Sequence, residues 1–272
     1  MDFLQYVING ISIGAVYAII ALGYTMVYGI AKMLNFAHGD VILVGAYASY
    51  CVTSYLGLPA LVSILVAIVV CTTLGILIEG LAYKPLRGTP SLAVLITAIG
   101  VSYFLQNAAQ LIFGSAPKNF KSIIAMKALN LFDGGLTITG EVLVTIVVCV
   151  AIMVGLTLFT SKTRMGKAMR AVSEDRAAAQ LMGINVNQTI SITFAIGSAL
   201  AAVAGVLLCS TVPTLMPTTG AMLGGILLGI IETFSKAYIS TQFSDAIVFS
   251  VLIIILLVKP AGLLGKQIQE KV

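Results

Sequence analysis

The sequence is poor in charge and lacks residue types that water-soluble proteins use freely. Only 9% of its 272 residues are charged, against about 25% in a typical soluble domain. It has no tryptophan and a single histidine, and 59% of its residues are hydrophobic. Polar groups cannot cover a water-exposed surface at this composition, so the bilayer is the expected solvent. The net charge of +5 is therefore informative through its distribution between membrane spans rather than as a sign of nucleic-acid binding.

Motifs that carry catalysis or nucleotide binding are absent from the sequence. There is no G-x-x-x-x-G-K-[ST] loop, and the glycine–lysine pair Gly265-Lys266 is followed by Gln267. There is also no H-E-x-x-H, no G-x-S-x-G and no clustered set of histidines and cysteines. The four cysteines lie apart inside apolar stretches, which favours burial as small hydrophobic residues. We therefore expect no enzyme activity, no metal and no cofactor in this chain, and any ATP would be bound by a partner.

Eight apolar stretches are long enough to cross a hydrocarbon core about 30 Å thick. Backbone polar groups in lipid must be satisfied within each stretch, so all eight are expected to be helices. Small residues at 198–205 predict close packing between them. The predicted fold is an all-α polytopic membrane protein in which residues 1–272 form one transmembrane domain. Its expected spans are 3–30, 34–56, 59–83, 92–113, 141–160, 189–212, 220–239 and 243–258.

The positions of lysine and arginine orient these spans. Basic residues follow the first, third, fifth and last spans, and the positive-inside rule places such clusters in the cytoplasm. The first three clusters agree: the N-terminus and loop 114–140 are extracytoplasmic, and loop 161–188 is cytoplasmic. The last cluster disagrees, because eight spans that begin outside must also end outside. Either one stretch after residue 189 does not span the membrane, or one span is missing between Val212 and Gly220.

The motif N-F-A-H-G-D at 35–40 opens the second predicted span and holds the only histidine. Ionisable groups at membrane depth are costly and usually face a cavity or one another. Asn35, His38 and Gly39 are therefore candidates for the substrate path. The alternative is an interfacial helix start, capped by Asn35 and with Asp40 near the positive end of the helix dipole. One histidine and one carboxylate do not complete a metal site.

Two glutamates also lie in apolar surroundings. Glu232 is a further candidate for the substrate path, although Lys236 four residues later would allow a self-neutralised helical ion pair instead. Glu79 lies shortly before Lys84 near the cytoplasmic surface, so we expect it to pair there and to snorkel toward water.

The cytoplasmic loop 161–188, hereafter the docking loop, has the pattern of an amphipathic helix. Apolar or small residues recur with helical spacing at positions 165, 168, 169, 172 and 179, and Gly183 suits the helix end. Glu174 and Asp175 can pair with Arg170 and Arg176, so the loop is unlike a polybasic lipid-binding segment. We predict a helix that docks in a groove of a partner protein; the alternative is a solvated loop without a partner. The predicted docking residues are Arg164, Lys167, Arg170, Glu174, Asp175, Ala178 and Gly183.

Three parts of the sequence together resemble the permease subunits of branched-chain amino acid ABC importers. They are G-A-V-Y-A-I-I-A-L-G at 14–23 with N-F-A-H-G at 35–39, T-R-M-G-K-A-M-R-A-V-S-E-D-R at 163–176 with its continuation to Gly183, and K-P-A-G-L-L-G at 259–265. These matches extend over nearly the whole chain. Three alanines at 177–179 and Gly183 keep the spacing of the importers' E-A-A…G coupling loop, with alanine in place of its glutamate.

The resemblance implies a subunit of a prokaryotic cytoplasmic (inner) membrane that pairs with a second, related permease. Two cytoplasmic ATP-binding subunits would drive the pair, and an extracytoplasmic solute-binding protein would deliver leucine, isoleucine or valine. Permeases of this kind have a further segment before the G-A-M-L-G-G stretch at 220–225, which agrees with a missing span. The motifs do not determine the substrate, so urea, short amides and other amino acids are alternatives, as is a stand-alone channel or carrier.

Overall fold

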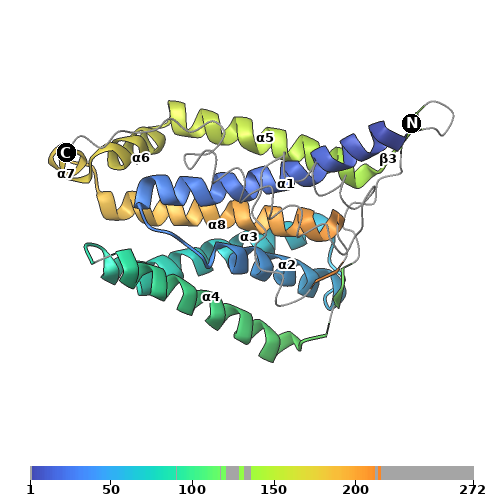
Figure 1. The fold of residues 1–272 in the computed structure, drawn as a ribbon, viewed down its shortest axis with the longest axis horizontal. Helices are drawn as coiled ribbons and strands as arrows, with labels where there is room; N and C mark the ends of the chain where they lie inside the picture. Colours follow the sequence, from blue (N-terminus) through green and yellow to red (C-terminus); the bar gives the residue numbers. More distant parts are fainter. Residues whose placement is uncertain are drawn as a thin grey trace.

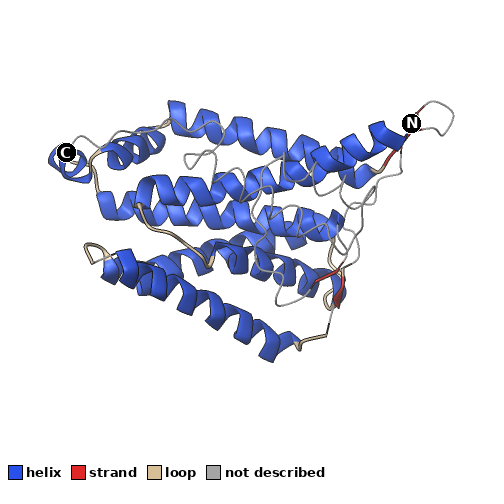
Figure 2. Cartoon of the chain, in the orientation of Figure 1, coloured by secondary structure: helices blue, strands red, loops and turns tan. Residues whose placement is uncertain are grey.

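The computed structural model describes residues 2–89, 91–116, 118–120, 129–131, 136–211 and 214–215. Within these ranges the chain is a bundle of long helices with two short strand pairs (Figures 1 and 2). The helices are α1 Asp2–Ala31, α2 His38–Ser54, α3 Ala60–Ile78, α4 Ser91–Phe113, α5 Gly140–Lys162, α6 Arg164–Glu174, α7 Arg176–Leu181 and α8 Val186–Thr211. A π-helical turn, Glu79–Tyr83, and a 3-10 turn, Lys84–Leu86, extend α3. The strands are β1 Lys118–Asn119, β2 Leu129–Leu131, β3 Leu136–Ile138 and β4 Thr214–Leu215.

All six predicted spans that fall in the described ranges are helices. Among the described residues, five helical segments are long and apolar enough to cross a membrane, so the chain is a multi-pass membrane protein. These segments are Tyr6–Ala31, Ala60–Leu86, Leu92–Phe113, Gly140–Lys162 and Val186–Thr211. The remaining one, α2, has 17 residues and starts four residues after the stretch predicted from residue 34. The predicted spans at 220–239 and 243–258 lie outside the described residues, as does most of the junction 212–220.

The strand pairing bears on the predicted alternation of the spans at α4 and α8. β1 follows α4 and pairs antiparallel with β4, which follows α8, so the ends of these two helices lie on the same side of the bundle. The docking-loop helices α6 and α7 lie at the opposite end, together with the end of α1 and the turn between α3 and α4 (Figure 1). Basic residues gather at this second end, which the positive-inside rule predicts to be cytoplasmic and which is called the cytoplasmic end below.

α8 is the centre of the bundle and packs against α1, α2 and α3. A methyl group on Gly205 would lie 2.4 Å from the carbonyl oxygen of Ile42 in α2. A methyl group on Gly75 in α3 would lie 2.0 Å from the hydroxyl oxygen of Ser198. Helices in lipid associate by such close backbone approach at small residues, and the stretch 198–205 supplies them as predicted.

α2 begins deep inside the bundle rather than at its cytoplasmic end. Lys32 follows the last residue of α1 and has a φ of 51°. From there, residues 32–37 run without helical structure back into the bundle. The His38 ring lies beside Gly23, where an added carbon would be 3.1 Å from His38 Cε1 and 3.3 Å from the carbonyl oxygen of Gly197. Gly23 precedes the end of α1 by eight residues and Gly197 follows the start of α8 by eleven. At a rise of 1.5 Å per residue, α2 therefore starts roughly 12–16 Å from the cytoplasmic ends of its neighbours, about half the hydrocarbon thickness.

Gly205→Ala is expected to lower the free energy of unfolding by about 1–3 kcal/mol, because its methyl group would meet the Ile42 backbone. Thermal unfolding of the purified protein in detergent measures this change. Gly155→Ala in α5 is the matched control, since nothing lies within 4 Å of the added carbon. Equal stability of the two variants would contradict the close approach of α2 and α8.

Candidate functional site

The docking loop forms two helices, α6 and α7, so the prediction of a single helix is wrong. The chain breaks at Asp175, whose backbone is extended with φ −149° and ψ 116°. Its carboxylate accepts hydrogen bonds from the backbone N–H groups of Ala177 at 2.7 Å and Ala178 at 3.0 Å. These contacts cap α7 and replace the hydrogen bonds that a continuous helix would make.

α6 is held firmly against the membrane helices. The Thr163 side chain caps it by accepting a hydrogen bond from the N–H of Gly166 at 3.0 Å. Gly166 lies close against the last turn of α5. A carbon added to Gly166 would be 2.4 Å from the carbonyl oxygen of Phe159. Met169 and Val172 are buried beneath α6. Four predicted docking residues are exposed on its outer face; they are Arg164, Lys167, Arg170 and Glu174.

α7 ends in exposed apolar side chains. It buries only Ala179, whereas Leu181 is 88% exposed and Met182 is 82% exposed. Gly183 follows with a φ of 82° and ends the helix, as the sequence predicts. Neither Leu181 nor Met182 is among the predicted docking residues, because a sequence pattern assigns apolar residues to the buried face. Adjacent exposed apolar side chains outside the membrane favour a contact surface over a solvated loop.

Two arginines of the docking loop bind backbone carbonyls rather than the carboxylates of the loop. Arg170 donates a hydrogen bond to the Ser161 carbonyl at 3.2 Å, and Arg176 donates one to the Ala31 carbonyl. The predicted pairing of Glu174 and Asp175 with arginines is therefore wrong. Within the described residues, the single ion pair joins Arg87 to Glu79.

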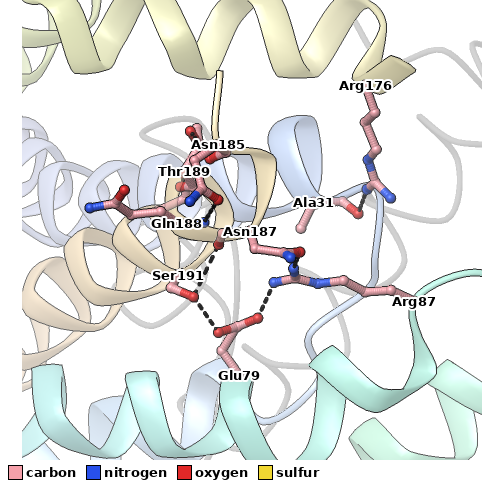
Figure 3. Close-up of polar contacts among 10 residues, drawn as sticks. Ala31, Glu79, Arg87, Arg176, Asn185, Asn187, Gln188, Thr189 and Ser191 are labelled. Atoms are coloured by element: carbon pink, nitrogen blue, oxygen red, sulfur yellow. Dashed lines mark hydrogen bonds and ion pairs between the residues drawn. The ribbon is translucent and has the colours of Figure 1, made fainter. Parts of the chain in front are cut away.

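Glu79, Arg87, Asn187 and Ser191 form a polar cluster at the base of the docking loop (Figure 3). Arg87 donates to the Glu79 carboxylate and to the Asn187 side-chain oxygen. The Ser191 hydroxyl donates to the second Glu79 oxygen at 2.6 Å. Glu79 is 2% exposed and faces α8, so the expectation that it snorkels and pairs with Lys84 is wrong. The cluster ties the end of α3 and the turn before α4 to the first turns of α8.

A cavity of about 670 Å³ lies between this cluster and α7. Its polar lining includes Arg87, Arg176, Gln180 and Asn185. Burial, and then the nearby charge of Arg87, lowers the pKa of the Arg176 guanidinium from its usual value. The cytoplasmic end of the bundle therefore holds two closely placed cations, of which Arg87 alone has a carboxylate partner among the described residues.

The residues predicted for the substrate path lie deep in the bundle. Asn35 is 5% exposed and accepts a hydrogen bond from the Tyr83 hydroxyl at 3.0 Å. It does not cap α2, since the capping position is Ala37 and has no side-chain hydrogen bond. His38 is 1% exposed, its Nε2 has no hydrogen-bond partner among the described residues, and Gly39 is buried beside it. Glu232 lies outside the described residues.

One buried polar residue of this region is not among the predicted site residues. Asp40 is 1% exposed and accepts a hydrogen bond from the Gln106 amide of α4 at 2.9 Å. None of Asn35, His38, Gly39 and Asp40 lines the cavity beside the docking loop, so their role in a substrate path stays a prediction.

Glu79→Gln is expected to lower the free energy of unfolding by about 3–5 kcal/mol, because it leaves the Arg87 charge without its carboxylate in a largely buried site. The double variant Glu79→Leu/Arg87→Met should recover most of that loss, since no unpaired charge remains. Thermal unfolding in detergent compares the variants, with the exposed Glu174→Gln as a control that should change little. Additive losses in the double variant would contradict the pairing.

Comparison with known proteins identifies the family. Residues 6–219 match the family model described as branched-chain amino acid transport system / permease component. The high-affinity branched-chain amino acid transport system permease protein LivH of Salmonella typhimurium is 40% identical, with 99% of this chain and 98% of that protein aligned. LivH of Escherichia coli K12 and BraD of Pseudomonas aeruginosa are also 40% identical, with the same coverage. No solved structure matches the chain at a significant level.

These alignments bear on the predicted missing span. The alignment with the Salmonella protein has 305 positions and this chain has 272 residues, so at least 33 positions hold a residue in the relative and none here. About 20 residues suffice for one span. The family match ends at residue 219, beside the junction where a missing span is one of the two explanations of the charge pattern. The alignments thus show that the relative has enough additional residues for one span, while a single missing segment at 212–220 stays a prediction.

The family match covers most of the chain, and the relatives at 40% identity cover nearly all of it. The helical bundle and its folded cytoplasmic loop agree with the architecture expected of such a subunit. The chain belongs to the family of permease components of branched-chain amino acid transport systems.

Proposed function

We propose that this chain is a permease subunit of an ABC importer that moves branched-chain amino acids across a prokaryotic cytoplasmic (inner) membrane. The observation that carries the proposal is the folded docking loop, which presents Leu181 and Met182 to the cytoplasmic side. The names of the relatives at 40% identity support the substrate class. Two ATP-binding subunits, a second related permease and an extracytoplasmic solute-binding protein complete the proposed importer.

Transport driven by a partner requires that the partner contact this chain differently in its two conformations. α6 and α7 are suited to that role because they lie at the cytoplasmic end and are already folded. The docking loop thus offers exposed charged residues on α6 and an exposed apolar pair at the end of α7, the two kinds of residue that make the rim and the centre of a protein interface. ATP binds to the partners in this proposal, and this chain itself holds no cofactor.

Uptake by the reconstituted importer tests the substrate class. Proteoliposomes that contain both permeases, the ATP-binding subunits and the solute-binding protein should take up labelled leucine only when ATP is present on the cytoplasmic side. Unlabelled isoleucine and valine should compete, and urea and acetamide should not. Competition by urea would favour an amide or urea permease. Leucine flux through this chain alone would favour a stand-alone carrier.

Leu181→Asp is expected to weaken binding of the ATP-binding subunits by roughly ten- to a hundredfold, because burial of a leucine side chain contributes about 1.5–3 kcal/mol. Co-purification in mild detergent measures the loss. Leu56→Asp is the matched control, since Leu56 is also exposed but lies in the turn at the extracytoplasmic end. Equal retention of the subunits by both variants would rule out α7 as a docking surface. Gly183→Ala and Ala178→Glu should impair uptake through the same surface.

His38→Gln is expected to reduce leucine uptake if the imidazole lines the substrate path. His38 also fills the space beside Gly23, so the variant must first be shown to be folded by its thermal unfolding temperature. Initial rates over a range of leucine concentrations then separate the roles. An unchanged KM and maximal rate in a stable variant would show that His38 only packs α1 against α8.

A further inference from the structure

Arg176 joins the docking loop to the end of the first membrane helix. It is the first residue of α7, and its guanidinium Nη2 donates a hydrogen bond to the carbonyl of Ala31, the last residue of α1 (Figure 3). The last carbonyl groups of a helix have no partner within the helix and carry the negative end of its dipole. The positively charged guanidinium of Arg176 both donates a hydrogen bond to this carbonyl and attracts the negative end of the α1 dipole.

The chain beyond Ala31 leads directly to the buried residues of the bundle. Lys32 turns the backbone, residues 32–37 run unwound into the bundle, and His38 begins α2 at about half the membrane depth. Asn35, midway along this segment, is bound by Tyr83. Only the six residues 32–37 separate Ala31 from the start of α2, so a displacement of Ala31 can reach α2 through them.

The surroundings of Arg176 leave its side chain room to move. The cavity of about 670 Å³ lies on one side of it, and a second cavity of about 270 Å³ lies on the other, between the end of α1 and the turn before α4. Arg87 is anchored by Glu79 and Asn187, whereas the Ala31 carbonyl is the one described hydrogen-bond partner of the Arg176 side chain. Burial and, second to it, repulsion by the anchored Arg87 lower the pKa of Arg176. The contact can therefore be broken and remade without repacking of the core.

We propose that Arg176 is a positioning residue that transmits movement of the docking loop to the end of α1 and, through residues 32–37, to the start of α2. The inference rests on the proposed docking of α7 to the ATP-binding subunits. Asp175 caps α7 through Ala177 and Ala178, so Arg176 moves with α7 as one piece. When a partner displaces α7, the Ala31 carbonyl either follows the guanidinium or loses it, and both outcomes change how residues 32–37 are held.

The ratio of leucine uptake to ATP hydrolysis in the reconstituted importer tests this role. Arg176→Met should lower that ratio at least about tenfold, the factor expected for loss of a hydrogen bond to a charged group. Arg176→Gln keeps a donor and should fall between Arg176→Met and the wild type. Lys84→Met removes an exposed positive charge from the same end of the bundle and should leave the ratio unchanged. An unchanged ratio in Arg176→Met would overturn the proposal, as would loss of the ATP-binding subunits from that variant, since Arg176 would then be a docking residue.

A distance measurement tests the transmitted movement in the otherwise unaltered protein. Spin labels attached at Lys32→Cys and Lys162→Cys report the distance between the end of α1 and the end of α5. Three of the four native thiols are buried and thus shielded from the labelling reagent; they are Cys71, Cys149 and Cys209. Trapping the complex with ATP and vanadate should shift this distance with Arg176 present and should not shift it in Arg176→Met. The absence of any shift with Arg176 present would overturn the inference even if Arg176→Met failed to fold. Failure of the docking proposal itself is seen separately, as full retention of ATP-binding subunits by Leu181→Asp.

Discussion

Lipid tails are as apolar as leucine, so α1, α2 and α3 depend on close contact with α8 for their association. Glycine makes that contact possible on two sides, at Gly205 against α2 and at Gly75 against α3. On the side of α8 that faces α1, the lack of a side chain at Gly23 leaves space for the His38 ring and for the carbonyl oxygen of Gly197 in α8. His38 and Asp40 are placed by these approaches, because both lie on α2, whose position the contact with α8 sets.

The same helix begins in the docking loop, which limits how movement can pass from the cytoplasm into the bundle. Asn187 and Ser191, in its first turns, bind Arg87 and Glu79, so moving α8 would break both the polar cluster and the glycine contacts. α7 carries no such restraint, because it buries one alanine and lies between Asp175 and Gly183, where the backbone leaves helical geometry. The structure therefore combines a fixed α8 with a lightly held α7, and a contact from α7 to another helix is the less costly route.

Much of this architecture could be predicted from the sequence, because apolar length decides which stretches cross a membrane and basic residues decide which ends are cytoplasmic. Hydropathy could not reveal the late start of α2, since Leu34, Phe36 and Ala37 are as apolar as a helix would be. The break at Asp175 was missed because helical spacing continues through it, whereas the carboxylate satisfies the N–H groups of the next turn. Glu79 was assigned to the nearest lysine, and its true partner lies eight residues away, beyond a change in helix type.

The central position of α8 also has a consequence for how the protein is made. Synthesis reaches Val186 roughly 150 residues after His38, which takes roughly 7–30 s at 5–20 residues per second. During that interval the first three helices have entered the membrane without the helix that later covers their polar groups. Most of those groups have partners that are made earlier than α8: Glu79 has Arg87, Asp40 has Gln106, and Asn35 has Tyr83. Nascent chains can thus shield their costly residues in the order of synthesis, and α8 closes around groups that are already paired.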